Sequence, residues 1–332
     1  MKSLFLLLFI SFYSLIGSGQ DPHFSQYHAS PLTLNPAMTG YHDGSFRICG
    51  NYRQQWLSLG SPYVTGTISF DSKLFEAKMD NNVLAFGVMG LYDQSLNSAF
   101  KSTNISASLA YHKALDGEGN NNLGIGFQFT YASRSINASQ LNFANQFNGT
   151  GFDNTLPSNE SFGNLQQNYP DLHAGILYSF KNELTQAYFG ASMYHITGPN
   201  ISFLKGETYR LPQRYTIHGG SKFIIGENKN ELFISGQYMR QGGVSDKIVG
   251  IAYGINGNSQ TMVYGGLWYR LKDAIIPFIG LTFGNFQLGI SYDVMASDLK
   301  NYNPKNGSYE LSLSFLGSKN SHANTKYLQC PF

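Results

Sequence analysis

Strict alternation of apolar with small or polar residues is the feature of this chain that most restricts its fold. In residues 123–131, Leu-Gly-Ile-Gly-Phe-Gln-Phe-Thr-Tyr, every odd position is apolar and every even position is small or polar. The same alternation occurs in residues 286–294 and 309–315. Because a side-chain period of two produces a β-strand with two different faces, the pattern predicts strands that separate an apolar environment from a polar one.

The first 19 residues have the features of a secretory signal peptide. Lys2 precedes an apolar run over residues 4–16, and the small residues 17–19 follow it. The run is too short to span a bilayer as a helix, and we expect cleavage before Gln20. A buried amphipathic helix is the alternative. After residue 16 no apolar run approaches the roughly 20 residues of a transmembrane helix, so the chain can enter a membrane only as a closed barrel.

The composition agrees with a barrel that has lipid on one side and a lumen on the other. Charged residues make up 13% of the chain, about half the average for globular proteins. Aromatic residues reach 15%, and there are 36 glycines, as interfacial and lumenal positions require. A net charge of +2 gives nucleic acid little to bind, and two cysteines exclude a disulfide-rich scaffold.

The predicted fold is all-β: a transmembrane antiparallel β-barrel of about 14 strands, with an N-terminal plug-like or periplasmic segment. A secreted β-sandwich is the alternative. Alternation places the strands at 45–56, 63–74, 82–92, 100–113, 122–136, 169–180, 186–196, 213–225, 230–240, 247–255, 260–270, 274–283, 286–295 and 308–316. Four segments are expected: a signal peptide (1–19), the N-terminal segment (20–44), the barrel (45–316) and a C-terminal periplasmic tail (317–332).

The lengths of the connections predict which end of the barrel faces outward. The two longest connections, 137–168 and 197–212, follow the fifth and seventh strands and therefore lie at the same end. Connections at the other end, such as 181–185 and 284–285, are short. Outer-membrane barrels have short periplasmic turns and longer external loops, so we expect a multi-pass barrel of the bacterial outer membrane, in contact with its lipid, with the long loops outside.

The first strand predicts which side chains face the lumen. Its inward positions are Arg47, Cys49, Asn51, Arg53 and Gln55, and its outward positions include Phe46, Ile48, Tyr52 and Trp56. An arginine facing lipid at mid-bilayer costs about 2–4 kcal/mol, so the charges must face inward. The last strand closes on the first and carries Glu310 on its inward face. Arg53 and Glu310 therefore either pair across this seam or are each solvated in the lumen.

Residue patterns that carry chemistry are scarce. The histidines lack metal-binding spacing, and His23 and His28 are expected to be solvated loop residues. Gly124 and Gly126 suit small lumenal positions rather than a phosphate-binding turn. The acids Asp171, Asp293 and Glu310 have no obvious catalytic partner. We predict no enzyme, no cofactor and no metal, and we leave open whether Cys49 and Cys330 form a disulfide.

The segment before the first strand carries the most specific pattern. Its residues are Asp21, Pro22, Phe24, Ser25, Gln26, Tyr27, Pro31, Asn35, Pro36, Ala37 and Gly40, followed in the first strand by Asn51, Arg53 and Gln55. Together they resemble the start of the PorP/SprF family of type IX secretion outer-membrane proteins of gliding and secreting Bacteroidetes. Further similarity lies at 143–146, 210–212 and 330–332. Cys49 does not match the family pattern.

The resemblance implies a barrel that works with the type IX export and gliding motility machinery. Its expected partners are a large secreted adhesin with a C-terminal sorting domain, which the barrel would help to export and retain at the surface. Periplasmic secretion components and peptidoglycan-binding components are also implied.

Two parts of the sequence suggest how this task is done. Residues 20–44 should be semi-rigid without regular structure, able to plug the lumen or dock in the periplasm; Asn35-Pro36-Ala37 resembles the hatch of fatty-acid transport barrels, which favours a plug. The loop 137–168 carries Phe143, Phe147, Phe152 and Phe162 among Asn and Gly, which suits protein recognition. A hatch-gated channel for apolar or small solutes and a structural anchor to peptidoglycan are the alternatives.

Overall fold

The structure, a computed structural model, describes residues 20–56, 61–75, 79, 81–160, 165–258, 260–297 and 307–317. The expected signal peptide, the expected tail beyond Gly317, Phe162 and Cys330 lie outside the described residues.

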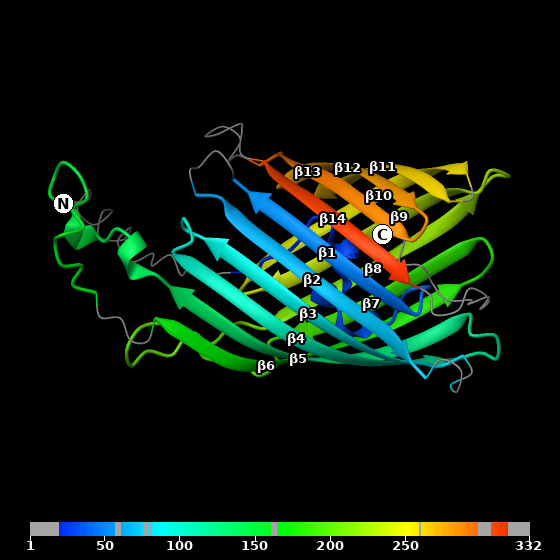
Figure 1. Cartoon of the computed structure of the whole chain (residues 1–332), viewed down its shortest axis with the longest axis horizontal. Helices are drawn as coiled ribbons and strands as arrows, with labels where there is room; N and C mark the ends of the chain where they lie inside the picture. Colours follow the sequence, from blue (N-terminus) through cyan, green and yellow to red (C-terminus); the bar gives the residue numbers. More distant parts are fainter. Residues whose placement is uncertain are drawn as a thin grey trace, which may run out of the picture.

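Within the described residues, 14 antiparallel strands form one closed barrel (Figure 1). The strands are β1 (Phe46–Gln55), β2 (Tyr63–Leu74), β3 (Val83–Ser95), β4 (Phe100–Ala114), β5 (Asn121–Ile136), β6 (Gln166–Lys181), β7 (Thr185–Tyr194), β8 (Arg214–Ile225), β9 (Asn230–Gln241), β10 (Val244–Asn258), β11 (Thr261–Arg270), β12 (Ala274–Phe283), β13 (Phe286–Met295) and β14 (Ser308–Gly317). Each strand pairs with its neighbours in sequence, and β1 closes on β14. The predicted fold class and strand number are confirmed.

Two strand ends differ from the sequence prediction for local reasons. The strand β10 begins three residues early because Gly242 and Gly243, both with positive φ, make a two-residue turn and let pairing continue up to Gln241 and Val244. At Trp56 the φ of 57° ends β1, so the side chain does not continue the outward row of that strand. It lies half-buried against Tyr63, with ring centroids 5.0 Å apart.

The two faces of the barrel differ as the alternation predicts. Large apolar side chains such as Ile68, Ile105 and Ile279 point outward and are about two-thirds exposed, at 65%, 66% and 68%. Arg47 and Arg53 point inward and are buried. The outer surface can therefore face lipid without exposing a charge at mid-bilayer. Among the described residues, no helix is long and apolar enough to span a membrane.

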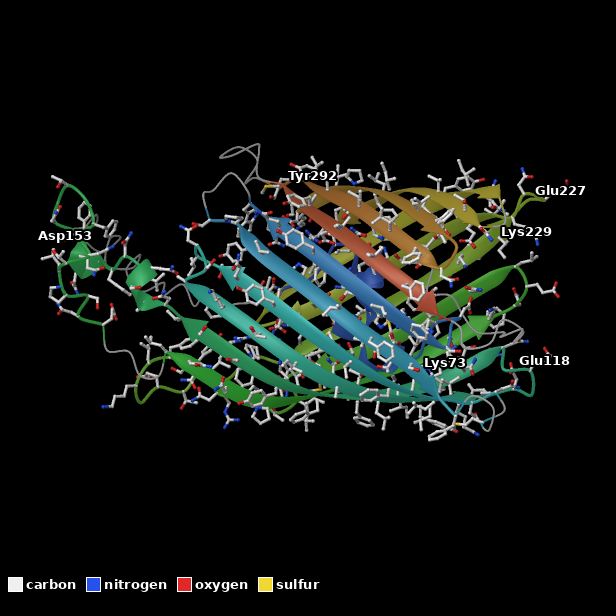
Figure 2. All side chains as sticks on the ribbon, in the orientation of Figure 1. Lys73, Glu118, Asp153, Glu227, Lys229 and Tyr292 are labelled. Carbon is white, nitrogen blue, oxygen red and sulfur yellow. The ribbon has the colours of Figure 1, made fainter. Side chains whose placement is uncertain are left out.

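The two ends of the barrel carry connections of different length. The β5–β6 connection, with its short helical turns η5 (Ala138–Gln140) and η6 (Ala144–Gln146), and the β7–β8 connection share one end, here called the long-loop end. The opposite, short-turn end carries brief connections at 182–184, 226–229 and 284–285. In Figure 2 Asp153 marks the far tip of the long-loop end, and Glu118, Glu227 and Lys229 mark the other end.

Residues 20–45, here called the plug, lie inside the barrel (blue in Figure 1). The plug is more regular than expected, because it contains η1 (Tyr27–Ala29), α2 (Pro31–Leu34) and η2 (Pro36–Met38). Pro31 and Pro36 each occupy the first turn of one of these pieces, where the fixed φ of proline favours helix and its missing N–H is not needed. The plug runs from the long-loop end, near Arg214 at the start of β8, to the short-turn end, where β1 begins.

Candidate functional site: the plug in the lumen

One face of the plug packs against an apolar wall of the lumen. Its buried residues Tyr27, Leu34, Ala37, Met38 and Tyr41 form one core with side chains from β6 to β12. The wall residues of this core are Leu177, Tyr188, Phe233, Ile248, Ala252, Tyr264, Trp268, Ala274, Ile276 and Phe278. This core gives the plug a hydrophobic attachment that an open aqueous pore would not have.

The expectation that His23 and His28 are solvated is wrong for His28 and holds only in part for His23, whose side chain is 22% exposed. His28 is 1% exposed and stacks on Trp268, with ring centroids 5.2 Å apart. Burial lowers the pKa of His28 to about 3, so the ring is neutral at neutral pH. His23 is also largely buried, and burial together with Arg270 and Arg53 lowers its pKa to about 3. The sequence missed this because the apolar wall that buries His28 comes from distant strands.

A row of glycines makes room for the tripeptide Asn35-Pro36-Ala37. A Cβ atom added at Gly126 on β5 would overlap the backbone of Pro36 and Ala37, and one added at Gly175 on β6 would overlap the side chain of Asn35. The Asn35 side chain accepts a hydrogen bond from Ala37 N at 2.8 Å and donates one to the carbonyl of Ile176 at 2.9 Å. Gly126 is thus the small lumenal residue that the sequence predicts, while the space beside Gly124 holds the His112 ring.

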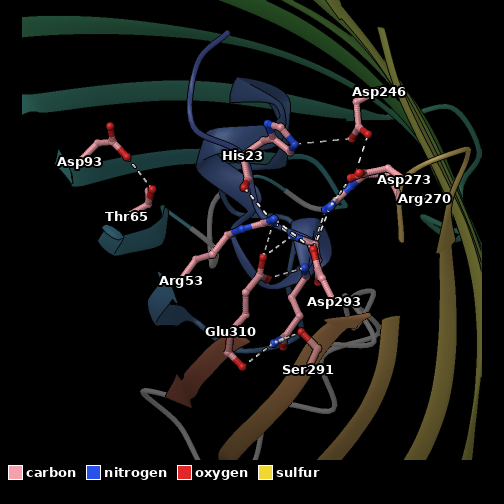
Figure 3. Close-up of polar contacts among 12 residues, drawn as sticks. His23, Arg53, Thr65, Asp93, Asp246, Arg270, Asp273, Ser291, Asp293 and Glu310 are labelled. Carbon is pink, nitrogen blue, oxygen red and sulfur yellow. Dashed lines mark hydrogen bonds and ion pairs between the residues drawn. The ribbon is translucent and has the colours of Figure 1, made fainter. Parts of the chain in front are cut away.

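The closing seam holds the plug through a buried charge network (Figure 3). Arg53 and Glu310 are direct cross-strand partners, with Nη1 and Oε1 2.6 Å apart and both side chains buried. The predicted pair is therefore present rather than two solvated charges. The carboxylate of Glu310 also accepts hydrogen bonds from the backbone N–H groups of Ser25, at 2.5 Å, and Gln26, at 2.8 Å.

Asp293 and Arg270 extend this network. Asp293 lies 3.0 Å from Arg53 and 2.8 Å from Arg270, and it accepts a hydrogen bond from Ser25 Oγ at 2.8 Å. Arg270 itself donates to Ser25 Oγ at 2.6 Å. The strand acids that had no evident partner in the sequence therefore bind arginines and the plug.

At the long-loop end, Asp21 fastens the start of the plug to the wall. Its carboxylate contacts His195 Nε2 at 2.5 Å, Arg214 at 3.4 Å and Arg134 at 3.7 Å. Burial raises the pKa of Asp21, but these cations outweigh burial and hold the pKa far below its usual value. On its other nitrogen, His195 bonds Asp171. Burial lowers the pKa of His195, but the two carboxylates outweigh this and the net shift is upward.

Asp171, His173 and His195 are the one group of described residues whose potential metal-ligand atoms lie within 4.8 Å of one another. Their donor atoms are already used in hydrogen bonds. His195 lies between two carboxylates, and His173 accepts from the His195 backbone N at 3.1 Å and bonds Thr130 Oγ1 at 2.9 Å. The arrangement acts as a charged clamp on the plug, here called the Asp21 clamp.

A second ion pair holds the plug at the short-turn end. Arg47 binds Asp71 at 2.9 Å and donates to the carbonyl of Met38 at 3.1 Å, and Asp71 accepts from Gly40 N at 2.7 Å. The sequence analysis missed Asp71. Its inward position on β2, directly opposite Arg47 on β1, is the signal that could have found it.

The other predicted site residues divide between the plug and the long loop. Phe24 is buried, as are Pro31, Pro36 and Gly40, while Pro22 and Gln55 are partly exposed. Asn51 accepts a weak hydrogen bond from Thr67 at 3.4 Å. In the β5–β6 connection Phe147 and Phe152 are exposed and pack edge to face, with centroids 5.3 Å apart, and Phe143 is half-buried.

Comparison with known proteins decides the family. The family model for the type IX secretion system membrane protein PorP/SprF matches residues 16–315. The chain belongs to the PorP/SprF family. The structure and the family together make it an outer-membrane β-barrel of the type IX secretion system. The comparison with curated proteins found no match.

Solved structures similar to this PorP/SprF protein are outer-membrane transporters. The toluene transporter TbuX of Ralstonia pickettii is 10% identical with a TM-score of 0.51, covering 90% of this chain and 96% of its own. Similarity also extends to a FadL homologue of Pseudomonas aeruginosa, which is 12% identical with a TM-score of 0.49 and covers 85% of this chain and 92% of its own. The toluene transporter TodX of Pseudomonas putida is 11% identical with a TM-score of 0.48 and covers 90% of this chain and 95% of its own. At 10% identity, the likeness to TbuX shows a shared barrel fold. The family indicates a membrane component of the type IX secretion system.

Proposed function

We propose that this barrel is a plugged outer-membrane partner of the type IX machinery that helps to export and retain a large adhesin carrying a C-terminal sorting domain. The observation that carries the proposal is the combination of a filled lumen with an ordered, aromatic loop at one end. A barrel whose lumen is occupied is better suited to binding a partner protein at its end than to passing a molecule through its lumen.

The occupied lumen is supported by the extent of the plug contacts. Asn35, Ala37, Met38 and Thr39 have no measurable exposure. Three ionic contacts, made by Asp21, by Glu310 and by Asp71, hold the plug at different heights in the barrel. Removing the plug would expose these charges and the apolar wall to water, so the closed state is the stable one.

The β5–β6 loop has the properties of a recognition surface. Phe147 and Phe152 are about half exposed, at 52% and 55%, yet the loop is held by its own hydrogen bonds. Asp153 N donates to the carbonyl of Gln146 at 2.8 Å, and the Gln146 side chain donates to the carbonyl of Leu156 at 3.0 Å. Exposed aromatic side chains on an ordered support are typical anchors of protein interfaces. We assign this loop, and the β7–β8 loop beside it, to the outside.

The short-turn end would then face the periplasm. Exposed charged residues such as Glu118, Glu227 and Lys229 lie on its turns (Figure 2). We propose that this end docks the periplasmic secretion and peptidoglycan-binding components of a gliding or secreting member of the Bacteroidetes.

Replacing residues 140–164 by a short Gly-Ser linker tests the adhesin role. We expect the adhesin to appear in the medium instead of on the cell surface, while the barrel still folds, as judged by heat-modifiable migration on gels. The double variant Phe147→Ser/Phe152→Ser should have the same effect without changing the length of the chain. The matched control Leu156→Ser removes another exposed apolar residue of this loop. Surface retention unchanged in both test variants would refute the proposal.

A hatch-gated channel is the second candidate. It is favoured by the opposite wall of the lumen, where the plug touches β2 and β4 through hydroxyl groups: Thr39 Oγ1 lies 2.9 Å from Ser108 Oγ, and Ser30 Oγ lies 3.5 Å from Thr67 Oγ1. Water could replace these contacts at little cost if the plug moved.

A removable tether distinguishes the two candidates. In a Cys49→Ser/Cys330→Ser background, Thr39→Cys with Ser108→Cys introduces a cysteine pair that can form a disulfide between the plug and β4. A gated channel would conduct ions in liposomes after reduction and stop after oxidation, whereas the plugged secretion partner should be closed in both states.

A further inference from the structure

A cavity of about 470 Å³ lies at the long-loop end of the barrel, above the plug. Its floor is the first part of the plug, residues 20–23, and its walls are the ends of β1 to β4 and of β10 to β14. The cavity therefore lies on the side of the plug that faces the long loops.

The wall formed by β10 to β14 carries more negative than positive charge. Arg270 alone contacts three carboxylates: Asp246 at 3.4 Å, Asp273 at 3.3 Å and Asp293 at 2.8 Å. Arg53 contacts Asp293 and Glu310. Of these groups, two guanidiniums (Arg53 and Arg270) and three carboxylates (Asp246, Asp273 and Asp293) line the cavity, a formal net charge of −1. His23 does not change this balance, because its lowered pKa of about 3 leaves it neutral.

Asp246 is the carboxylate with an unused oxygen. The residue lines the cavity and is 7% exposed, and its buried Oδ2 accepts no hydrogen bond from any described residue. The neighbour of this oxygen is the neutral His23 ring, at 4.0 Å (Figure 3). A buried carboxylate oxygen without a donor is costly, so the cavity is preorganised for a cationic donor.

The geometry favours an organic cation over a metal ion. The other spare acid, Asp93 at the end of β3, lies on the opposite side of the plug from Asp246 in Figure 3, and the Asp21 clamp is the one described group that meets metal-ligand spacing. Aromatic side chains also line the cavity: Trp56, Tyr63 and Phe100. These rings lie on the side of the cavity across from Asp246, where they can contact the residues that flank the bound cation. A guanidinium carries five N–H donors and can therefore bind the free oxygen of Asp246 and a neighbouring acceptor together.

We propose that this cavity binds an arginine side chain of an extended polypeptide segment, with Asp246 as the principal acceptor. The volume exceeds that of one side chain, so it also admits flanking backbone. The proposal rests on the proposed function only in naming the exported partner as the source of that segment. The site itself depends on the charges and rings described above.

The test uses the full mature chain in detergent micelles. The probes are the peptide acetyl-Gly-Gly-Arg-Gly-Gly-amide and its citrulline analogue, which has nearly the same shape without the charge, titrated by calorimetry. We expect saturable binding of the arginine peptide and binding at least about tenfold weaker for citrulline, since a charge-assisted hydrogen bond is lost. Asp246→Asn should weaken arginine-peptide binding by at least about tenfold. Asp153→Asn, on the long loop, is the matched control and should leave it unchanged.

Several outcomes would overturn the inference. These are no binding by the wild type, equal binding of the two peptides, or loss of binding in Asp153→Asn as great as in Asp246→Asn. Calcium binding that depends on Asp246 and excludes the peptide would assign the site to a metal instead. Failure of the proposed function is separately visible: peptide binding would persist while deletion of 140–164 left adhesin retention unchanged.

Discussion

Glu310 joins two parts of the chain that are far apart in sequence. Its carboxylate binds Arg53 on β1 and accepts hydrogen bonds from two backbone N–H groups of the plug. The residue is 2% exposed, so water cannot replace these donors if the carboxylate is removed. A single side chain thus stabilises both the closure of the barrel and the seating of the plug.

Glu310→Ala should therefore destabilise the protein strongly. The substitution removes one of the carboxylates that bind the buried guanidinium of Arg53, and it leaves the N–H groups of Ser25 and Gln26 without acceptors. We therefore expect the free energy of unfolding to fall by about 3–5 kcal/mol. Urea unfolding in lipid vesicles measures this. Replacing both partners, Arg53→Met with Glu310→Leu, should recover only the part of the loss that comes from the unpaired guanidinium, because the Ser25 and Gln26 N–H groups still lack an acceptor. The exposed Glu118→Gln is the control. A change for Glu310→Ala no larger than that of the control would contradict this account.

His195 makes the Asp21 clamp sensitive to pH. The groups that face it are Asp21 on the plug, Asp171 and His173 on β6, and Arg214 on β8. Its pKa is raised in the folded protein, so its contribution to stability is complete below the unfolded value of about 6.5 and is lost as pH rises through the folded value. The pKa of Asp21 is lowered, so its contribution is lost only in strong acid.

His195→Gln removes this dependence, because glutamine cannot carry the proton. As pH rises above the unfolded pKa of about 6.5, the free energy of unfolding of the wild type should fall. The free energy of unfolding of the variant should fall less over the same range, because glutamine does not titrate. Urea unfolding at a series of pH values supplies the comparison. Parallel curves for the two proteins would show that His195 is not the titrating group.

At the scale of elements, the plug is three short helical turns shaped by their surroundings. Pieces of three or four residues have no stability of their own in water. Prolines begin two of them, Asn35 caps η2, and the wall supplies the remaining hydrogen bonds. The glycines on β5 and β6 set how closely the plug approaches that wall. The fit depends on the absence of side chains there.

Gly126→Ala should disturb this fit. The added methyl group would overlap the Pro36 and Ala37 backbone, so we expect a loss of about 1–3 kcal/mol from overpacking and faster proteolysis of the plug. Gly265→Ala is the matched control, because nothing lies within 4 Å of its added Cβ. Limited proteolysis and urea unfolding read out both effects. Equal behaviour of the two variants would argue against close packing at Gly126.

At the scale of the whole molecule, closure of the sheet and the difference between its ends matter most. Pairing of β1 with β14 satisfies the backbone polar groups of every strand, which is what lets the outer face be apolar in lipid. The closed wall then encloses a lumen that the plug fills from one end to the other. The long loops and the arginine cavity lie at one end, and the short turns at the other.

Epitope insertion tests this polarity. A tag between Gly149 and Thr150, at the tip of the long loop, should be labelled by antibody on intact cells. A tag between Glu118 and Gly119, in the β4–β5 turn, should be labelled only after the outer membrane is permeabilised, because that turn would face the periplasm. Reversed labelling would invert the orientation and place the cavity in the periplasm.

The sequence alone determined the wall of this protein. Alternation fixed which residues form strands and which face inward, because lipid and lumen impose a strict period of two on every strand. Closure of the last strand on the first brought Arg53 and Glu310 together in the prediction, but the sequence left a pair and two solvated charges as alternatives, and the structure shows the pair. The two longest connections share one end because both follow odd-numbered strands, although short turns such as residues 242–243 also lie at that end.

Only the tertiary structure decided what fills the lumen of the barrel. The burial of His28, the Asp21 clamp and the seating of Asn35 join residues more than 140 positions apart in sequence or depend on several strands at once. The periodicity of apolar residues cannot predict such contacts, because the plug has too little regular secondary structure to show a periodic pattern. Whether residues 20–45 hang free or occupy the lumen depends on the free energy of packing against a surface that exists only after the barrel has closed.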